Sequence, residues 1–570
     1  MKSPRPPTRG DGETAPGWLW LAALCAAVLA YWAIQYQPFV LPNNDYHSFE
    51  RVARSFAELE LPSSFKRMPV LPALMALLAP WMPEPHPYLH AALVWNQLFS
   101  LGVLVGLFLL GRRTLGRAGW LLPLLFATTT QFHANGLQPL VEPSLGFFVV
   151  WAFVLQGRGS PWQYAAAFGA ALSRYEAALL IPVLFLAEWS ERRELWPPLW
   201  KAALATSGLL LWAGAGALLS SGGGSSYYEL MSGMGFEPAP GFFVRSLKEP
   251  FAGWYTGQWI WRVVFAGVVL LPLLAGVVVG LRERKREMLS VLGFGVLCVA
   301  TIVVFGINKA RYVYPTEWIW LFFWLWGAIQ LGGWVKQELE KRPAALAWGA
   351  AGFAALLALG SLLFWLRKMS GEPQTSSLGV ELAFVACALG LALAALWPRG
   401  SARPAVHAAF VAGFGLALVP LISGGLVGKQ RAVHKIAYAN WSAYRVADWL
   451  GEHLQPDDRV VLLPRTHIQY LLPRARPQLR SYSQLEAEDA DAMRAEFLEK
   501  GLTVAVFTDR GPLRNPSHHY YYREKKTYLA EVFESGAPVP GFRHVGTLTL
   551  PPHIDRKPVQ IYRFTDAAGG

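Results

Sequence analysis

Charged residues are scarce in this chain. Asp, Glu, Lys and Arg together make up 16% of its 570 residues, whereas hydrophobic residues make up 53%. Soluble domains carry about a quarter charged residues, so this composition excludes a soluble globular protein for most of the chain. The composition indicates a polytopic membrane protein.

Cysteine is also rare. The chain has three, Cys25, Cys298 and Cys387, and each lies inside an apolar segment. A disulfide framework or a zinc site needs cysteines that are paired or closely spaced in polar surroundings, so the sequence predicts neither. We expect no metal site and no cofactor.

Acidic residues are outnumbered by basic ones, which gives a formal net charge of +13. From Asn440 onward there are 17 basic and 16 acidic residues, so nearly all of the excess belongs to the apolar part of the chain and its loops. A basic excess in such loops indicates membrane topology and contact with anionic lipid, not a nucleic-acid partner.

Long apolar runs fill the first 430 residues, and about 13 of them are long enough to span a bilayer. The predicted spans are 18–36, 88–111, 118–133, 139–156, 161–172, 176–189, 200–220, 258–281, 289–306, 315–333, 346–366, 379–397 and 404–426. The run 68–81 is shorter, and we expect it to lie at the membrane interface.

The loops between these spans alternate in charge. Lys and Arg gather at 111–117, 191–194, 282–287 and 336–342, and the N-terminal tail 1–17 falls on the same side. The positive-inside rule makes that side cytoplasmic. The sequence thus predicts a multi-pass protein of the inner (plasma) membrane, with a transmembrane domain at 18–430 and an exoplasmic first loop at 37–87. The C-terminal domain would lie in the periplasm or outside the cell.

Residues 440–570 have the composition of a soluble α/β domain. Strands are predicted at 459–464, 502–509, 546–550 and 559–564, and helices at 442–454 and 487–500. The predicted fold class is therefore an α-helical polytopic membrane protein with a C-terminal soluble α/β domain.

The first exoplasmic loop combines an isolated acid with a basic pair. Asp45 precedes an amphipathic segment, 48–59, which is suited to lie on a membrane surface, and Lys66 and Arg67 follow it. This set suits chemistry on a charged lipid headgroup. The alternative for Asp45 is an ordinary N-cap of the helix, since Asp favours that position.

Three further charged clusters are predicted on the same side. The first is Glu142, at the start of an apolar span; the second is Arg174 with Glu176; the third is Lys309, Arg311 and Tyr312. Each alone also fits a structural ion pair at a helix end. Because all of these clusters are predicted on the exoplasmic side, we expect them to form one site. We expect the long loop 221–257 to cover it.

These residue types suit the transfer of a sugar from a lipid phosphate. An attacking hydroxyl must lose its proton to a base, for which a carboxylate is suited, and Arg or Lys stabilises the departing phosphate. We assign Asp45 and Glu142 as candidate catalytic acids. The candidate substrate-binding residues are Lys66, Arg67, Arg174, Glu176, Lys309, Arg311 and Tyr312.

The motifs resemble those of the GT-C superfamily of polyprenyl-phosphate-sugar glycosyltransferases. The likeness rests on the first loop with Asp45, on VEPSLGFF (141–148), on LSRYEAALLIP (172–182) and on NKARYVYP (308–315). Within the superfamily, the chain is most similar to the branch of aminoarabinose transferases and protein O-mannosyltransferase-like enzymes.

The resemblance implies a role for several residues. Asp45 matches the catalytic acid of the first loop, Glu142 takes the place of a second functional acid, and Lys66 with Arg67 matches the basic residue that contacts lipid phosphate. Where several branches have paired acids, this chain has Asn43 and Asn44 before the Asp. This departure argues against a bound divalent metal and against the oligosaccharyltransferase type. We expect an inverting, metal-independent transfer.

Two other functions stay open at this stage. A transporter or flippase of a lipid-linked sugar would use the same cations, although the sequence shows no inverted repeat. A membrane-anchored scaffold would work through the C-terminal domain, which carries no phosphate loop, metal set or nucleophile elbow. For a transferase, the acceptor hydroxyl could belong to a glycan, a lipid or a protein.

Overall fold

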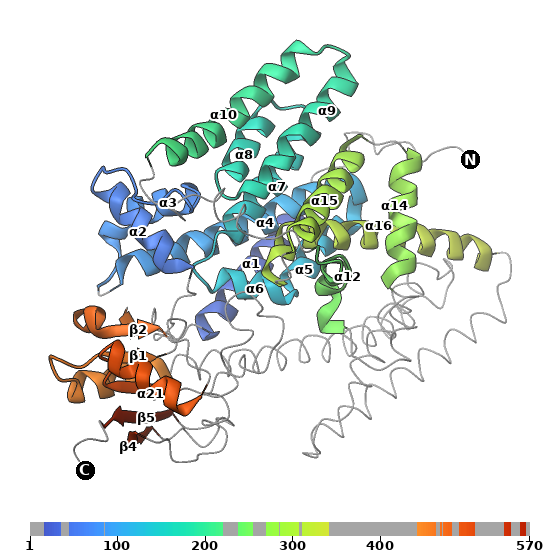
Figure 1. Cartoon of the computed structure of the whole chain (residues 1–570). Helices are drawn as coiled ribbons and strands as arrows, with labels where there is room; N and C mark the ends of the chain where they lie inside the picture. Colours follow the sequence, from blue (N-terminus) through green and yellow to red (C-terminus); the bar gives the residue numbers. More distant parts are fainter. Residues whose placement is uncertain are drawn as a thin grey trace. The chain divides into compact units, whose positions relative to one another are not determined.

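The computed structural model describes two compact units. They are a helical unit, Met1–Tyr36 with Ser48–Lys429, and an α/β unit, Gln37–His47 with Gln430–Gly570 (Figure 1). The described residues are 16–35, 45–84, 86–219, 238–254, 269–283, 286–306, 310–340, 442–462, 468–469, 471–481, 489–507, 541–548 and 559–565.

The helical unit is built from α-helices joined by short 3-10 helices, labelled η. In chain order it contains α1 (Pro16–Gln35), α2 (Tyr46–Ala57), α3 (Val70–Leu78), η1 (Ala79–Trp81), α4 (Pro87–Leu115), η2 (Gly116–Trp120), α5 (Leu121–Ala127), α6 (Thr130–Gly136), α7 (Glu142–Gly157), α8 (Trp162–Ala171), η3 (Tyr175–Leu179), α9 (Leu180–Arg192), α10 (Trp196–Leu219), α12 (Gly241–Lys248), η4 (Glu249–Trp254), α14 (Leu271–Glu283), α15 (Arg286–Val304), η6 (Ala310–Val313) and α16 (Tyr314–Glu340).

Three helices of the described part are long and apolar enough to cross a membrane, namely Pro87–Leu115, Trp196–Leu219 and Glu287–Val304. The predicted total of about 13 spans stays a prediction, because the predicted spans 346–366, 379–397 and 404–426 lie outside the described residues. The predicted amphipathic helix at 48–59 is confirmed as α2, which buries Phe49, Val52 and Ala53.

The predicted span 118–133 is not one continuous helix, because the chain breaks there into α5 and α6. Thr129 has an extended backbone and caps α6, its hydroxyl accepting a hydrogen bond from the Phe132 N–H at 3.3 Å. A threonine side chain that can replace a helical backbone partner favours such a restart. An apolar run alone does not reveal the break.

The second half of the predicted covering loop 221–257 is helical. Residues 238–254 form α12 and η4, and Phe242 and Phe251 of this segment are fully buried. The pattern of GFFVRSLK gives α12 one apolar face, which accounts for its packing against the bundle. Residues 221–237 and 255–257 of the loop lie outside the described residues.

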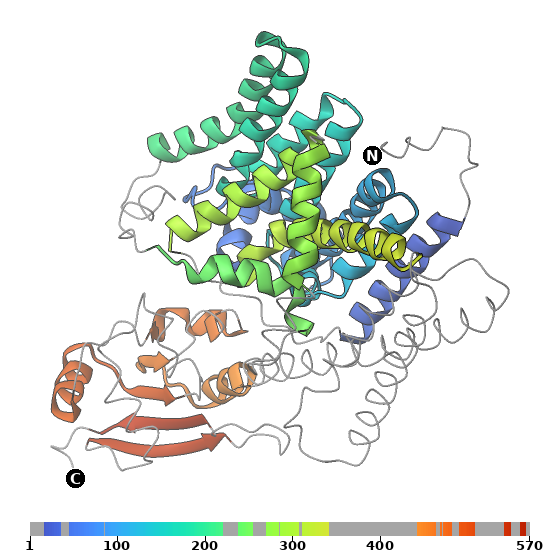
Figure 2. The same ribbon diagram turned by 90° about the vertical axis from the view of Figure 1, so that its right-hand side faces the viewer.

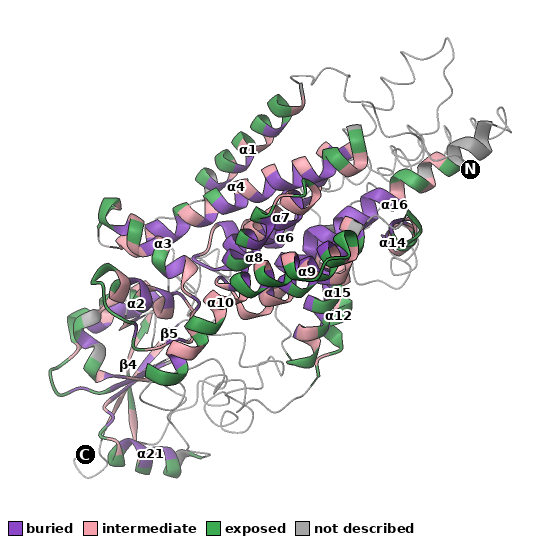
Figure 3. Ribbon diagram, turned by 90° about the horizontal axis from the view of Figure 1, so that it is seen from above, coloured by how far each residue is buried: buried purple, intermediate pink, exposed green. Residues whose placement is uncertain are grey.

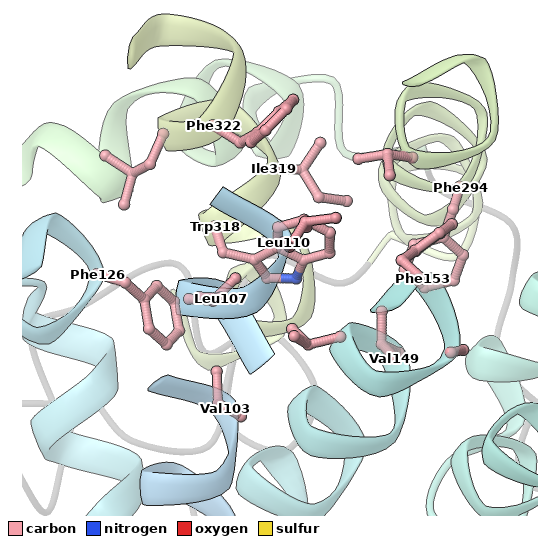
Figure 4. Close-up of a cluster of buried hydrophobic side chains, with 14 of the residues drawn as sticks. Val103, Leu107, Leu110, Phe126, Val149, Phe153, Phe294, Trp318, Ile319 and Phe322 are labelled. Carbon is pink, nitrogen blue, oxygen red and sulfur yellow. The ribbon is translucent and has the colours of Figure 1, made fainter. Parts of the chain in front are cut away.

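Side chains from five helices meet in the core of the helical unit. Figure 4 shows Val103, Leu107 and Leu110 of α4 facing α5, α7, α15 and α16. The ring of Phe153 lies 6.0 Å from that of Phe294 and 5.9 Å from that of Trp318. Figure 3 shows the contrast between α4 and α7, which are largely buried, and α10, which is largely exposed. Lipid is as apolar as these side chains, so close packing rather than the hydrophobic effect holds the helices together.

Glycine permits close contacts of α16 at two places. A Cβ on Gly146 of α7 would lie 2.7 Å from the ring of Tyr314, at the start of α16. Farther along, Gly327 packs directly on the Pro272 carbonyl of α14, where a Cβ would overlap the backbone. Small residues allow helix backbones to approach in this way. The first contact sets the position of α16, and so of the residues just before it.

The α/β unit contains a five-stranded sheet (Figure 2). Its strands are β1 (Val460–Leu462), β2 (Leu479–Ser481), β3 (Val504–Phe507), β4 (Phe542–Leu548) and β5 (Val559–Phe564), in the order β2-β1-β3-β5-β4. β1 pairs in parallel with β2 and β3, whereas β5 is antiparallel to both β3 and β4. β1, β3, β4 and β5 overlap the segments that the sequence predicts as strands.

Each face of the sheet carries its own core. Leu462, Val504 and Ile561 pack with the helix 442–453, whereas Val461 and Ala505 pack with α21 (Ala490–Glu499) on the other side. Alternate residues of a strand point to opposite faces, which explains the two clusters. The result is a three-layer α/β arrangement.

Asp458 lies two residues before β1, and its side chain connects the start of that strand with Arg563 of β5. Its carboxylate accepts two hydrogen bonds from Arg563 of β5, at 2.9 and 3.0 Å, and one from the Thr503 hydroxyl at 2.8 Å. Burial raises the pKa of Asp458, but the Gln455 N–H, Thr503 and Arg563 together outweigh it and hold the pKa below its ordinary value. The carboxylate therefore stabilises the fold in its ionised form.

Candidate active site

Glu142 begins α7, and local sequence explains why the helix starts there. Pro143 follows it, and proline is tolerated in the first turn of a helix because that turn has no intrahelical partner for its N–H. Negative charge is favoured at a helix N-terminus, which lowers the cost of burying this carboxylate. Its side chain is only 1% exposed.

Arg174 approaches Glu142 from the corner between α8 and η3. Its backbone is extended, and its guanidinium donates through Nη1 to the Glu142 Oε1 at 2.8 Å. The Nε of the same side chain lies 2.6 Å from the Glu176 Oε1. One arginine thus holds two carboxylates, a charge-assisted arrangement that is stronger than neutral hydrogen bonds.

η6 supplies the third side of the cluster. The Arg311 Nε lies 3.7 Å from the Glu142 Oε1, so two guanidinium groups share one carboxylate oxygen. The ring of Tyr312 lies beneath both, with its centroid 4.2 Å from the Arg174 Cζ and 5.4 Å from the Arg311 Cζ. Cation–π contacts of this kind fix the plane of a guanidinium.

The structure therefore brings together five of the residues that the sequence singled out. Segments 32 and 169 residues beyond Glu142 converge on it. The Arg174 and Arg311 side chains are 12% and 19% exposed, whereas the second carboxylate oxygen of Glu142, Oε2, is buried without a hydrogen-bond partner among the described residues. Both arginine side chains keep some exposed surface, whereas the Glu142 carboxylate has almost none.

The loop with Lys66 and Arg67 adjoins the same corner. The Val70 N–H donates to the Leu172 carbonyl at 3.3 Å, and the Tyr175 hydroxyl lies 3.5 Å from the Phe65 carbonyl. Arg67 donates from Nε to the Ser48 hydroxyl at 2.6 Å and lies over the Phe49 ring. These contacts attach the loop next to the segment that carries Arg174.

Two predicted site residues cannot be placed with this cluster. Asp45 is half-buried, immediately precedes α2 and belongs to the α/β unit, so its predicted part in this site stays a prediction. Lys309 lies outside the described residues.

Sequence reasoning missed a second buried acid. Glu317, in the first turn of α16, is fully buried and accepts a hydrogen bond from the Thr129 hydroxyl at 3.1 Å. The phenol of Tyr314 lies within electrostatic reach of both Glu317 and Glu142. The signal was available, since an acid inside an apolar span is costly and by default functional.

A metal site finds no support in the described part of the chain, where no three His, Cys, Asp or Glu side chains gather in a way that could hold an ion. The cluster around Glu142 has as many guanidinium groups as carboxylates. The charges of this cluster therefore balance one another.

Comparison with solved structures identifies the fold as that of the GT-C superfamily of glycosyltransferases. The chain is similar to ArnT from Cupriavidus metallidurans bound to undecaprenyl phosphate, with a TM-score of 0.54. The two sequences are 14% identical, and the match covers 98% of this chain and 100% of ArnT. The apo state of the same protein gives 14% identity over 96% and 98% of the two chains, with a TM-score of 0.53.

A weaker similarity extends to the oligosaccharyltransferase of Archaeoglobus fulgidus in the apo form, with 12% identity, 94% of this chain and 80% of that chain covered, and a TM-score of 0.49. No protein-family model and no curated protein matches the sequence. At these identities the likeness is one of fold, and the predicted GT-C resemblance is confirmed at that level.

Proposed function

We propose that this protein is a membrane glycosyltransferase that moves a sugar from a polyprenyl-phosphate-linked donor to a hydroxyl acceptor. The observation that carries the proposal is the convergence of Arg174 and Arg311 on the buried Glu142. It is supported by the fold shared with ArnT, which binds undecaprenyl phosphate.

Arg174 and Arg311 bind the donor phosphate in this proposal. A guanidinium has five N–H donors, and the contacts to Glu142 and Glu176 occupy only two nitrogens of Arg174. The remaining donors are held in a fixed plane over Tyr312, which suits a phosphate. Lys66, Arg67 and Lys309 are the further cations that we assign to the lipid phosphate.

Glu142 has a positioning role in this proposal rather than the catalytic role suggested by sequence. A carboxylate that is 1% exposed and shares one oxygen between two arginines has almost no surface from which to contact a substrate hydroxyl. Its charge instead orients both guanidinium groups. This leaves Asp45 as the candidate base.

The proposed reaction is a direct displacement. The acceptor oxygen attacks the anomeric carbon as its proton passes to the Asp45 carboxylate, and the bond between that carbon and the phosphate oxygen breaks. The polyprenyl phosphate leaves with the electron pair and is stabilised by Arg174 and Arg311. One displacement inverts the anomeric configuration.

Asp45→Asn tests the base. Asn caps a helix about as well as Asp, so the variant keeps any capping role but loses the proton acceptor. With a panel of polyprenyl-phosphate sugars as donors, we expect the turnover of the purified enzyme to fall by about 10² or more, with donor affinity unchanged. Parental turnover by this variant would assign Asp45 to capping alone.

The proposed orientation places 1–17 in the cytoplasm and 440–570 on the exoplasmic face, where transfer would occur. Its support is the alternation of basic loops along the sequence. Reporter fusions after Arg286 and after Gly570 should report opposite sides of the membrane. Reporters on the same side would overturn the orientation and with it the single exoplasmic site.

A further inference from the structure

α4 carries two polar side chains in the first half of an otherwise apolar helix. Asn96 and Ser100 are both fully buried, and because they are four residues apart they lie on the same side of α4. The helix is long and apolar enough to cross a membrane, where a buried polar side chain is costly and is by default functional. The proposed transfer gives neither residue a role.

Asn96 pairs with the backbone of the loop that leads into α7. Its Nδ2 donates to the Gln138 carbonyl at 2.6 Å and to the Leu140 carbonyl at 2.8 Å. A side-chain amide has two N–H donors, and both are used here. Residues 137–141 are not helical, so their buried carbonyls need partners from outside the loop. Asn96 therefore fixes the chain just before Glu142.

Tyr314 lies one helical turn from Glu142. Its ring packs on Gly146, which is four residues after Glu142 on the same face of α7, and a Cβ there would lie 2.7 Å from the ring. The Tyr314 hydroxyl lies close to Ser100, short of hydrogen-bonding geometry, and within electrostatic reach of Glu142. It thus lies between the polar side chains of α4 and the carboxylate that begins α7.

The polar atoms of these residues match as donors and acceptors. They are the Asn96 Oδ1, the Ser100 Oγ, the Tyr314 hydroxyl and the Glu142 Oε2, which are all buried and have no hydrogen-bond partner among the described residues. Two hydroxyl hydrogens face one amide oxygen and one carboxylate oxygen, so the set can be satisfied completely within itself. Buried polar atoms are nearly always hydrogen-bonded, which favours such pairing.

We infer that Asn96, Ser100 and Tyr314 form a buried polar layer that positions Glu142. In this layer Tyr314 donates to the Glu142 Oε2, Ser100 donates to the Asn96 Oδ1, and small side-chain movements complete both hydrogen bonds. The layer thereby holds the Glu142 Oε1 between the two guanidinium groups that share it. The three act through Glu142 and are positioning residues. Their effect on donor binding rests on the proposed function, whereas the layer itself does not.

Hydrogen exchange of the full chain in mixed micelles tests the layer without a donor. Asn96→Leu removes both hydrogen bonds to the loop, so the amides of 140–146 and of 310–313 should exchange about tenfold faster or more. Gln156→Leu is the matched control, because Gln156 lies at the other end of α7 and donates to the Ser290 hydroxyl at 3.0 Å. Unchanged exchange in Asn96→Leu, or equal acceleration in the control, would overturn the inference.

Tyr314→Phe removes one hydroxyl from the layer. The dissociation constant of a polyprenyl-phosphate donor should rise about three- to tenfold, the value of one hydrogen bond. A hydroxyl that only joins helices would lower the unfolding temperature but leave this constant unchanged. Tyr164→Phe is the matched control, because Tyr164 is also buried but its hydroxyl lies near Glu188. It should bind the donor as the parent does.

The results separate the layer from the proposed function. If the parent binds no polyprenyl-phosphate sugar, the proposed transfer is wrong, and hydrogen exchange still decides whether the layer holds Glu142. If the parent binds the donor and Tyr314→Phe binds it equally well, the transfer stands and the positioning role is overturned. If Asn96→Leu does not fold, the exchange of 140–146 and 310–313 in Tyr314→Phe decides in its place.

Discussion

Two buried glutamates, Glu142 at the start of α7 and Glu188 near the end of α9, are each held by two cations. Glu142 takes its cations from segments 32 and 169 residues away, and both are largely buried. Glu188 takes one from its own helix, Arg192 four residues on, and one from the next helix. Arg192 is 50% exposed. The first cluster is a tertiary contact that fixes the fold and the proposed site, whereas the second is nearly local.

The largest effect should come from removing the two carboxylates. Glu142→Leu leaves Arg174 and Arg311 without their shared anion, and an uncompensated buried charge costs about 3–5 kcal/mol. Glu188→Leu should cost less, about 1–2 kcal/mol, because Arg192 can turn to water. Unfolding in mixed micelles measures both. If Glu188→Leu lost as much stability as Glu142→Leu, or more, the two clusters would not differ in the way proposed.

Arginine variants test whether the Glu142 cluster, and not the other end of α7, binds the donor. Arg311→Gln should weaken binding of a polyprenyl-phosphate donor by about 1.5–3 kcal/mol, that is by tenfold or more, the value of a charge-assisted hydrogen bond. Arg158→Gln serves as the control, because Arg158 is exposed and directly follows α7 at its other end. Isothermal titration with the donor lipid gives both values. Equal losses would mean that net charge, not the cluster, attracts the donor.

Asp458 of the α/β unit is another buried acid, and its carboxylate accepts more hydrogen bonds than that of Glu142. Asp458→Asn should lower the stability of this unit at pH 7 by about 1–3 kcal/mol. Because the folded-state pKa is lowered, the stabilisation is fully present above the ordinary value of 3.8 and is lost as pH falls through the folded-state value. Hydrogen exchange of β3 and β5 in the full chain should show the stabilities of the two proteins converging as the pH falls below 3.8. A difference independent of pH would contradict this account.

The smallest effect is expected where an ion pair is open to solvent. The Arg54 Nη2 lies 2.7 Å from the Glu50 Oε1 on α2, but the arginine is 55% exposed. Glu50→Gln should change stability by about 0.5 kcal/mol or less, and less still in high salt. Thermal unfolding at two salt concentrations measures this, and a loss comparable to that of Glu142→Leu would show that burial is not what separates these pairs.

Local patterns predicted the elements better than their contacts. The period of apolar residues placed α2 within two residues of its bounds, and β3 and β5 were visible as apolar runs. β2 was missed because it has three residues with Arg480 at its centre. The break at Thr129 was missed because a side-chain cap does not interrupt hydropathy.

The candidate site shows the same limit. Glu142, Arg174 and Arg311 each stood out as charges beside apolar spans, yet nothing in the sequence says that they share one oxygen atom. That contact depends on how α7 packs against α16, which Gly146 permits.

The sequence positions of the residues in the Glu142 cluster also determine the order in which they are synthesised. Arg174 is made 32 residues after Glu142 and Arg311 169 residues after it. At a synthesis rate of about 5–20 residues per second, Glu142 waits about 2–6 s for its first partner and about 10–30 s for its second. The growing chain must therefore insert α7 while this acid is protonated, hydrated or sheltered by the insertion machinery. Pairing with Arg174 ends that exposure, and the arrival of η6 completes the cluster.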